Sequence, residues 1–180
     1  MASAWLCEKP TAQGACGECP SCHAIAVRTH ADLEVLMPET VMIELGWPLS
    51  EKAQDEIDKK TRKPSKEIRV DAMRDAVEFS QRTDARGRGK AVLVFPAERM
   101  NTITANALLK TLEEPPGDVR FVLATEAGHM LLPTIRSRTQ HFEFSLLTAT
   151  ELEDYVRWVV GDAGLTVDVD AVSWVVRQGR

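Results

Sequence analysis

Four cysteines near the start of the chain are the residues best suited to bind a metal ion. They are the only cysteines in the 180-residue sequence and follow the spacing C-x8-C-x2-C-x2-C: Cys7, Cys16, Cys19 and Cys22. Four thiolates complete the tetrahedral coordination of a structural Zn²⁺ and leave no position for water or substrate. The spacing therefore predicts a zinc knuckle over residues 7–22 that organises a loop and takes no part in catalysis.

Other interpretations of these cysteines are open at this point. The cluster is also compatible with a set of free thiols or with an iron–sulfur centre. The run from Cys19 to His23 matches the haem-attachment pattern C-x-x-C-H, but that chemistry requires export and leaves Cys7 and Cys16 unexplained. His23 and His30 offer competing imidazole ligands, although four sulfurs suffice for zinc.

The composition describes an ordinary globular chain with a mildly acidic character. The sequence is 44% hydrophobic and 27% charged, and its formal net charge is −5. No run of 18 apolar residues and no signal peptide is visible, because Met1–Leu6 is too short and lacks a basic region. Clustered cysteines without a secretion signal favour metal ligands over disulfides and predict a cytoplasmic protein. The acidic balance disfavours autonomous nucleic-acid binding.

Alternating strand and helix patterns predict an α/β domain with a parallel sheet. Short apolar runs typical of strands occur at 32–37, 91–95 and 120–124, with further strand patterns at 68–70 and 140–144, where Phe142 and Phe144 share one face. Helical patterns occur at 2–6, at 24–28, from a cap at Asp71 to Ser80, from Ala105 to the stop at Pro115-Pro116-Gly117, and at 133–137.

The same patterns divide the chain into two parts. Residues 1–147 form the predicted α/β domain, and only helical periodicity follows in 148–180. Within the first part, residues 40–67 are rich in charge and poor in large apolar groups, so we expect a polar, solvated insertion. The mixed signs of 51–66 favour a solvated surface over DNA contact, whereas the basic turn Arg86–Lys90 is a better candidate for DNA contact.

Several segments, in order, resemble the bacterial clamp-loader proteins of the AAA+ family. The run Asn106–Pro116 (NALLKTLEEPP) is followed by Phe121–Thr125 (FVLAT) and by Thr134–Arg138 (TIRSR), and the cysteine knuckle lies just before His30-Ala31-Asp32. The resemblance implies an AAA+ type parallel sheet flanked by helices, with the start of a small helical lid domain after it.

Two departures from that family imply that the chain has no ATPase site of its own. Relatives with ATPase activity carry G-x4-GK[ST], whose backbone N–H groups bind phosphates, and no such run occurs here. Counting back from Asn106 places Phe95-Pro96 where active relatives have the Asp-Glu pair of the Walker B motif. We therefore expect a fragment that lacks the P-loop region and the collar domain of a subunit that does not hydrolyse ATP.

The resemblance assigns the chemistry to Arg138. In the family, a Ser-Arg-Cys motif supplies an arginine finger to ATP on a neighbouring subunit, and here the run is Ser137-Arg138-Thr139. A guanidinium is always charged and can bond two phosphate oxygens at once. The predicted catalytic residues in trans are therefore Arg138 and the adjacent Ser137, with Arg136 as the nearby competitor. Thr125 matches the sensor-1 position and is expected to be structural.

The implied function is that of a non-catalytic clamp-loader subunit of DNA polymerase III in DNA replication. As a component of that nucleotidyltransferase holoenzyme, it is expected to bind the ATPase subunits and the clamp-opening subunit, and to reach the sliding clamp and primer-template DNA through the complex. The alternatives are an AAA+ ATPase active in its own right and a zinc-ribbon module that binds nucleic acid. Phe95-Pro96 argues against the first, and the net charge of −5 against the second.

Overall fold

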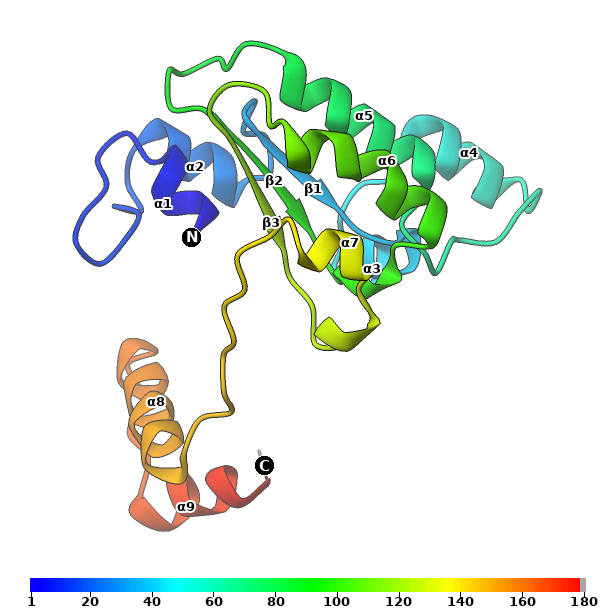
Figure 1. Ribbon diagram of the computed structural model, residues 1–180. Coiled ribbons are helices and arrows are strands. Elements are labelled where there is room, and N and C mark those ends of the chain that lie inside the picture. The colour runs from blue at the N-terminus through cyan, green and yellow to red at the C-terminus, as the bar shows by residue number, and fades with distance from the viewer. Residues whose placement is uncertain (179–180) are drawn as a thin grey trace. The chain divides into compact units, whose positions relative to one another are not determined.

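The structure is a computed structural model that describes residues 1–178, and it contains two compact units. The first unit comprises Met1–Gln140 and the second begins at His141. Figure 1 shows the helices and strands of each unit. No helix in the described part of the chain combines the length and apolar character needed to cross a membrane.

A parallel three-stranded sheet forms the centre of the first unit. Its strands are β1 (Leu33–Leu36), β2 (Lys90–Val94) and β3 (Val119–Leu123), in the order β1-β2-β3. Val35 pairs with Leu93, which in turn pairs with Val122. The central strand is buried along most of its length, as expected of a parallel strand covered on both faces. The three main predicted strands are therefore confirmed.

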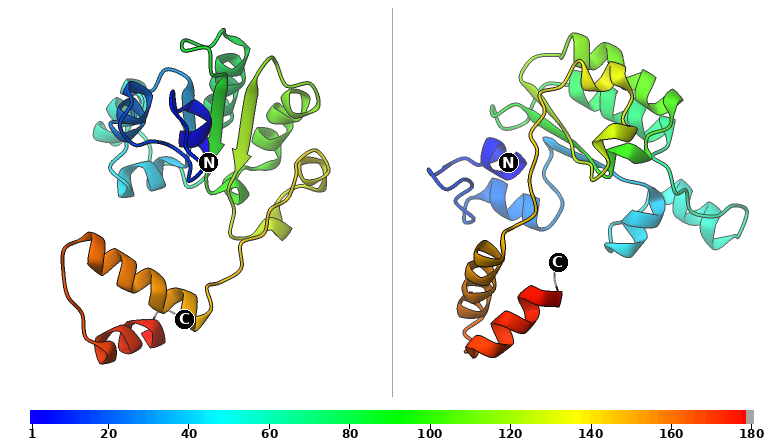
Figure 2. Two further views of the ribbon diagram at one scale, coloured as in Figure 1. Left: turned by 90° about the vertical axis from the view of Figure 1, so that its left-hand side faces the viewer. Right: turned by 60° about the horizontal axis from the view of Figure 1, so that its bottom comes forward.

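Helices cover both faces of this sheet, which gives an AAA+ type α/β fold. On one face lie α1 (Ala2–Leu6) and α2 (Pro20–Ala26), and on the other lie α5 (Val70–Gln81) and α6 (Thr102–Glu113) (Figures 1 and 2). The core between the sheet and the second pair of helices consists of Leu36, Ile68, Met73, Ala76, Val92, Val94, Ala97 and Leu108.

Local signals explain where the two core helices begin and end. Asn101 caps α6, because its side chain accepts a hydrogen bond from the Thr104 N–H at 3.0 Å, and Pro115-Pro116 follows directly after its end. The predicted cap of α5 at Asp71 is wrong: the helix begins at Val70 after Arg69. Asp71 lies in the first turn, where a negative charge is favourable next to the positive end of the helix dipole.

The charged segment predicted to be a polar, solvated insertion contains two helices, α3 (Glu39–Glu44) and α4 (Glu51–Asp58). Ser50 caps α4 by accepting a hydrogen bond from the Ala53 N–H. Glu39 is buried and bonded to Arg62, which also pairs with Glu56. Charged residues thus hold this segment in place by bonding to one another, which composition alone does not reveal.

The strand predicted at 140–144 does not form. Residues 140–148 have no helix or strand, and Phe142 and Phe144 are 66% and 81% exposed. A strand needs a neighbour that pairs with its backbone groups, and in residues 1–178 the sheet contains only β1, β2 and β3. The alternation of the two phenylalanines was therefore not sufficient evidence for a strand.

Short helical turns complete the first unit, and two helices form the second. The turns are η1 (Ala97–Arg99), η2 (Gly128–Met130) and α7 (Pro133–Arg136). The second unit contains α8 (Ala149–Asp162), which begins with a capping box formed by Thr148 and Glu151, and α9 (Val169–Gln178). The contact between α8 and α9 leaves Val172 and Val176 buried.

Candidate metal centre and arginine site

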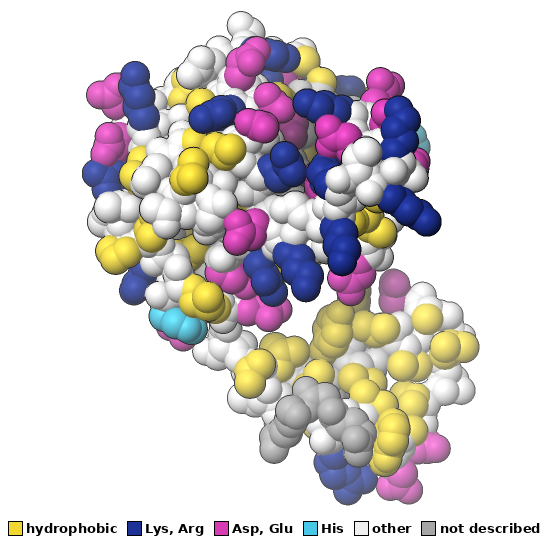
Figure 3. Space-filling view, turned by 90° about the vertical axis from the view of Figure 1, so that its right-hand side faces the viewer, with side chains coloured by type: hydrophobic (Ala, Val, Ile, Leu, Met, Phe, Trp, Pro, Cys, Tyr) yellow, Lys and Arg dark blue, Asp and Glu magenta, His cyan; other side chains and the backbone are white. Residues whose placement is uncertain are grey.

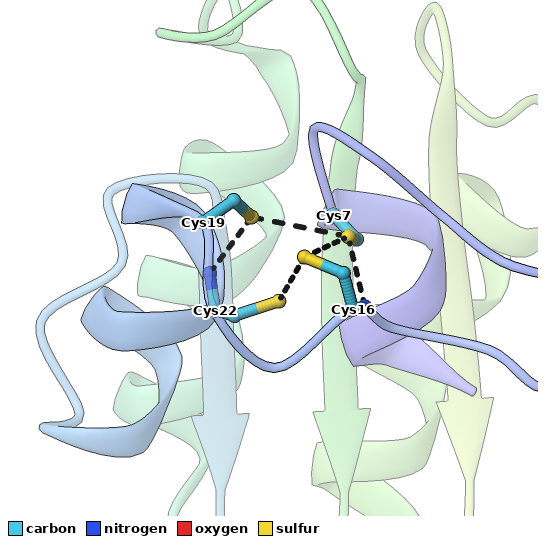
Figure 4. A group of neighbouring side chains, drawn as sticks. All are labelled: Cys7, Cys16, Cys19 and Cys22. Atoms are coloured by element: carbon cyan, nitrogen blue, oxygen red, sulfur yellow. Dashed lines mark hydrogen bonds between the residues drawn. The ribbon is translucent and has the colours of Figure 1, made fainter.

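The four cysteines come together at the ends of α1 and α2 (Figure 4). The Sγ–Sγ distances are 3.5 Å from Cys7 to Cys16, 3.8 Å from Cys7 to Cys19 and 3.9 Å from Cys16 to Cys22. All four sulfurs lie within 4.8 Å of one another. A tetrahedral zinc site with Zn–S bonds of ~2.3 Å requires sulfurs about 3.8 Å apart. The geometry therefore fits a metal ion of this kind.

The backbone around the cluster favours ionised thiols. The N–H groups of Lys9 and Cys16 both donate to Cys7 Sγ at 3.3 Å, and the Cys22 N–H donates to Cys19 Sγ at 3.5 Å. The hydrogen bond from Cys22 is the main cause that lowers the pKa of Cys19 to about 6. Burial has the opposite effect at Cys22 and raises the pKa of that thiol to about 12. A bound cation would offset the cost of ionising the buried Cys22 thiol.

The two histidines considered from the sequence do not join this group, which consists of the four cysteines in the described part of the chain. The ring of His30 is buried, and its Nδ1 accepts a hydrogen bond from the Asp32 N–H at 3.0 Å. His23 lies in α2, one residue after Cys22. The four-cysteine ligand set predicted from the spacing is thus the one that the structure brings together.

A polar contact joins the cysteine knuckle to the turn before β2. Glu8 Oε1 accepts hydrogen bonds from Ser21 Oγ at 3.0 Å and from Arg86 Nη1 at 2.8 Å. The hydrogen bond from Ser21, followed by that from Arg86, lowers the pKa of Glu8. Arg86, which was a candidate for DNA contact, is therefore paired within the protein.

Lys90, the other end of the basic turn, is also paired within the protein. Its Nζ lies 3.3 Å from Asp32 Oδ1, with only 5% and 0% of the two side chains exposed, and 4.1 Å from the centre of the Phe79 ring. Figure 3 shows Lys and Arg side chains interspersed with Asp and Glu on one face of the protein. The pairing of Arg86 and Lys90 with carboxylates of the same chain does not favour the basic turn as a DNA-binding patch.

The carboxyl ends of β2 and β3 carry the residues that the resemblance to AAA+ proteins aligns with an ATPase site. Phe95-Pro96 follows β2 directly and supplies no carboxylate. Glu98, in η1, reaches this edge of the sheet, where its Oε2 accepts a hydrogen bond from Thr125 Oγ1 at 2.5 Å. Glu98 comes only a few residues after the end of β2, and this short separation in the sequence indicates that it stays near the end of the strand.

Arg138 lies two residues after α7, and its side chain is 33% exposed. Its Nη1 donates to the Thr134 carbonyl oxygen at 2.9 Å and to Ser137 Oγ at 3.2 Å. Its Nε donates to Glu113 Oε1 at 2.7 Å, and Nη2 lies 2.5 Å from the same oxygen. Glu113, the last residue of α6, is a partner of Arg138 that the sequence alone did not indicate.

The other sequence-predicted residues of this site lie beside Arg138. Ser137 Oγ donates to the Thr134 carbonyl oxygen at 3.2 Å and so closes the end of α7. Thr139, in the position of the family's cysteine, donates to the Ile135 carbonyl oxygen at 3.1 Å. Arg136 is the last residue of α7. The structure thus gives Arg138 a fixed position at the surface of the first unit.

Comparison with known protein families places most of the chain in one group. Residues 1–148 match the family model described as DNA polymerase III, delta subunit. The chain is 44% identical over 133 residues to DNA polymerase III subunit delta' of Pseudomonas aeruginosa and 35% identical over 133 residues to the same subunit of Escherichia coli. Both alignments cover 74% of this chain, which spans about a third of these relatives (34% and 33%).

Comparison with a solved structure points to the same group. A crystal structure of a DNA polymerase III, gamma subunit-related protein from Thermotoga maritima is similar with a TM-score of 0.51 and 27% sequence identity. The match covers 78% of this chain and 40% of that protein. Most of this chain therefore shares its fold with a DNA polymerase III, gamma subunit-related protein.

Proposed function

The chain belongs to the DNA polymerase III, delta subunit family, and from that premise we propose that it acts as a non-catalytic clamp-loader subunit of the delta-prime type. In this proposal it binds the ATPase subunits and the clamp-opening subunit in the cytoplasm. The assembled complex loads the sliding clamp onto primer-template DNA. Residues 148–180 are part of the helical lid domain in this arrangement.

The observation that carries the proposal is the position of Arg138. Its guanidinium lies near the surface after α7, where Nη1 is bonded to the Thr134 carbonyl oxygen and to Ser137 Oγ. An arginine finger acts on a neighbouring subunit, so it must be near the surface and must have a defined place. We propose that Arg138 donates this charge in trans to the γ-phosphate of ATP on the adjacent subunit, with Ser137 as its positioning neighbour.

The end of β2 supports the non-catalytic part of the proposal. Phe95-Pro96 offers neither a carboxylate to orient Mg²⁺ nor one to activate water. Glu98 is the one observation that favours the alternative, an ATPase in its own right, because its carboxylate reaches the sheet edge at Thr125. ATP turnover by the full-length subunit alone tests this alternative, and appreciable hydrolysis would support it.

We propose further that Cys7, Cys16, Cys19 and Cys22 hold a structural Zn²⁺. The close approach of the four sulfurs and the backbone N–H groups directed at them support this assignment. When bound, the ion supplies a fixed positive centre that neutralises the thiolates. The chain's own contribution is to bring α1 and α2 together around it and to tie the knuckle to Arg86 through Glu8.

The decisive experiment replaces Arg138 by Ala in the full-length subunit and measures ATP hydrolysis by the assembled clamp-loader complex. We expect hydrolysis at the neighbouring site to fall by about tenfold or more, since arginine fingers have larger effects still in GTPases. Arg138→Lys keeps the positive charge but lacks the paired N–H groups of the guanidinium, so this variant should recover little of the lost ATP hydrolysis. Unchanged hydrolysis in a fully assembled complex would contradict the arginine-finger role.

A further inference from the structure

The guanidinium of Arg138 is bonded to a carboxylate that the proposed function leaves without a role. Glu113 is the last residue of α6, and its side chain is 48% exposed. Its Oε1 accepts the hydrogen bond from Arg138 Nε at 2.7 Å and pairs with Nη2 at 2.5 Å. The edge of the guanidinium formed by Nε and Nη2 therefore faces an anion of its own subunit.

The Nε–Nη2 edge of a guanidinium is one of the edges through which it binds a phosphate. Two parallel N–H groups match two oxygens of either a carboxylate or a phosphate. The other terminal nitrogen, Nη1, is already bonded to the Thr134 carbonyl oxygen and to Ser137 Oγ. A phosphate that takes up the Nε–Nη2 edge must therefore displace the carboxylate of Glu113.

Helix electrostatics give Glu113 no stabilising role in α6 itself. An acidic residue at the last position of a helix faces the negative end of the helix dipole, which is unfavourable. The guanidinium of Arg138 offsets this charge, and its Nη1 also bonds a carbonyl oxygen at the end of α7. The guanidinium of Arg138 therefore lies beside the negative ends of both α6 and α7. Its bond to the Thr134 carbonyl oxygen keeps it near this position when the bond to Glu113 is replaced.

We propose that Glu113 is a latch for Arg138, an intramolecular anion that occupies its Nε–Nη2 edge until phosphate oxygens of ATP on a neighbouring subunit replace it. This inference rests on the proposed function of Arg138. The latch is weak, because the side chains are 33% and 48% exposed and solvent screens such pairs. It therefore sets how often the finger is available and does not prevent its use. Glu113 is a positioning residue that acts through Arg138.

The test uses Glu113→Gln in the full-length subunit, assembled with its ATPase partners and supplied with ATP. Removing the competing charge should raise kcat/KM for ATP hydrolysis by about two- to fivefold, the size expected for a half-exposed ion pair. The gain should shrink as salt is added, because salt screens the pair in the unaltered protein. A purely structural role for Glu113 predicts no gain at any salt concentration.

Two controls make the outcome specific. Glu114→Gln removes the same charge one residue later, where no bond to Arg138 exists, and should leave kcat/KM unchanged. In the Arg138→Ala background, Glu113→Gln should also have no effect, since the guanidinium that Glu113 binds is absent.

The outcomes separate the two proposals. If Arg138→Ala lowers hydrolysis while Glu113→Gln lowers it or leaves it unchanged, the latch role of Glu113 is wrong and the arginine-finger role of Arg138 is retained. If Arg138→Ala itself has no effect, both proposals fall.

Discussion

Asp32 and Lys90 form an ion pair that is almost completely buried between the first strand and the second. Lys90 Nζ lies 3.3 Å from Asp32 Oδ1, and the same oxygen accepts a hydrogen bond from the Ala85 N–H at 2.7 Å. Asp32 Oδ2 has no hydrogen-bond partner in the described structure. The charge of Asp32 thus depends on Lys90 for its compensation.

Replacing Lys90 by Met should therefore destabilise the first unit strongly. The variant leaves the buried Asp32 without a counter-charge, which typically costs about 3–5 kcal/mol in the free energy of unfolding. Urea unfolding of this chain measures the change. Arg88→Met, which removes a charge from the same turn, is the control and should cost less than about 1 kcal/mol. A loss of less than about 1 kcal/mol for Lys90→Met would contradict the inference that Lys90 compensates the charge of Asp32.

Metal content and the effect of its removal test the cysteine centre. We expect about one zinc per chain, because four thiolates complete one tetrahedral shell. Chelation should increase hydrogen exchange in residues 7–26 far more than in β2, which is bonded on both sides to neighbouring strands. Cys22→Ser should reproduce this pattern without a chelator. A coloured, iron-containing product would reject zinc, and unchanged exchange would reject a stabilising metal.

The contact of Glu39 with Arg62 should stabilise the segment of α3 and α4. The carboxylate of Glu39 is paired with Arg62 and accepts the Ser65 N–H at 2.8 Å, and only 9% of the side chain is exposed. Glu39→Gln should cost about 2 kcal/mol in the free energy of unfolding at pH 7. Asp55→Asn, which breaks an exposed pair with Lys59, should cost a few tenths of a kcal/mol at most.

The cost of Glu39→Gln should also depend on pH. Burial raises the pKa of Glu39, but the hydrogen bonds from Arg62 and Ser65 outweigh it, so the pKa is lowered in the folded protein. A carboxyl group with a lowered pKa stabilises the fold above its unfolded pKa of about 4.3, and this contribution is lost as the pH falls through the folded value. The difference between the two proteins should therefore shrink below about pH 4, and a constant difference would contradict the assignment.

The sequence predicted those features that depend on residues close to one another along the chain. The cysteine spacing predicted the cluster of four thiols, and the apolar runs predicted β1, β2 and β3. Phe142 and Phe144 failed as a strand signal, because a strand depends on a neighbour that no local pattern reveals. Glu113 was missed for a similar reason, since it meets Arg138 across 25 positions of sequence and only folding brings them together.

The carboxylate of Glu98 provides the last prediction, which separates a supporting subunit from an active ATPase. Glu98 accepts a hydrogen bond from Thr125, and no second carboxylate replaces the Asp-Glu pair at Phe95-Pro96. If the site is inactive, Glu98→Gln in the full-length subunit should leave ATP hydrolysis by the assembled complex within about twofold of the unaltered rate. If Glu98 activates water, the same change should lower hydrolysis by a hundredfold or more at this subunit's own site, since general bases contribute about 10²–10⁴-fold. Comparison with Arg138→Ala in the same assay shows that the assay responds to a residue acting in trans.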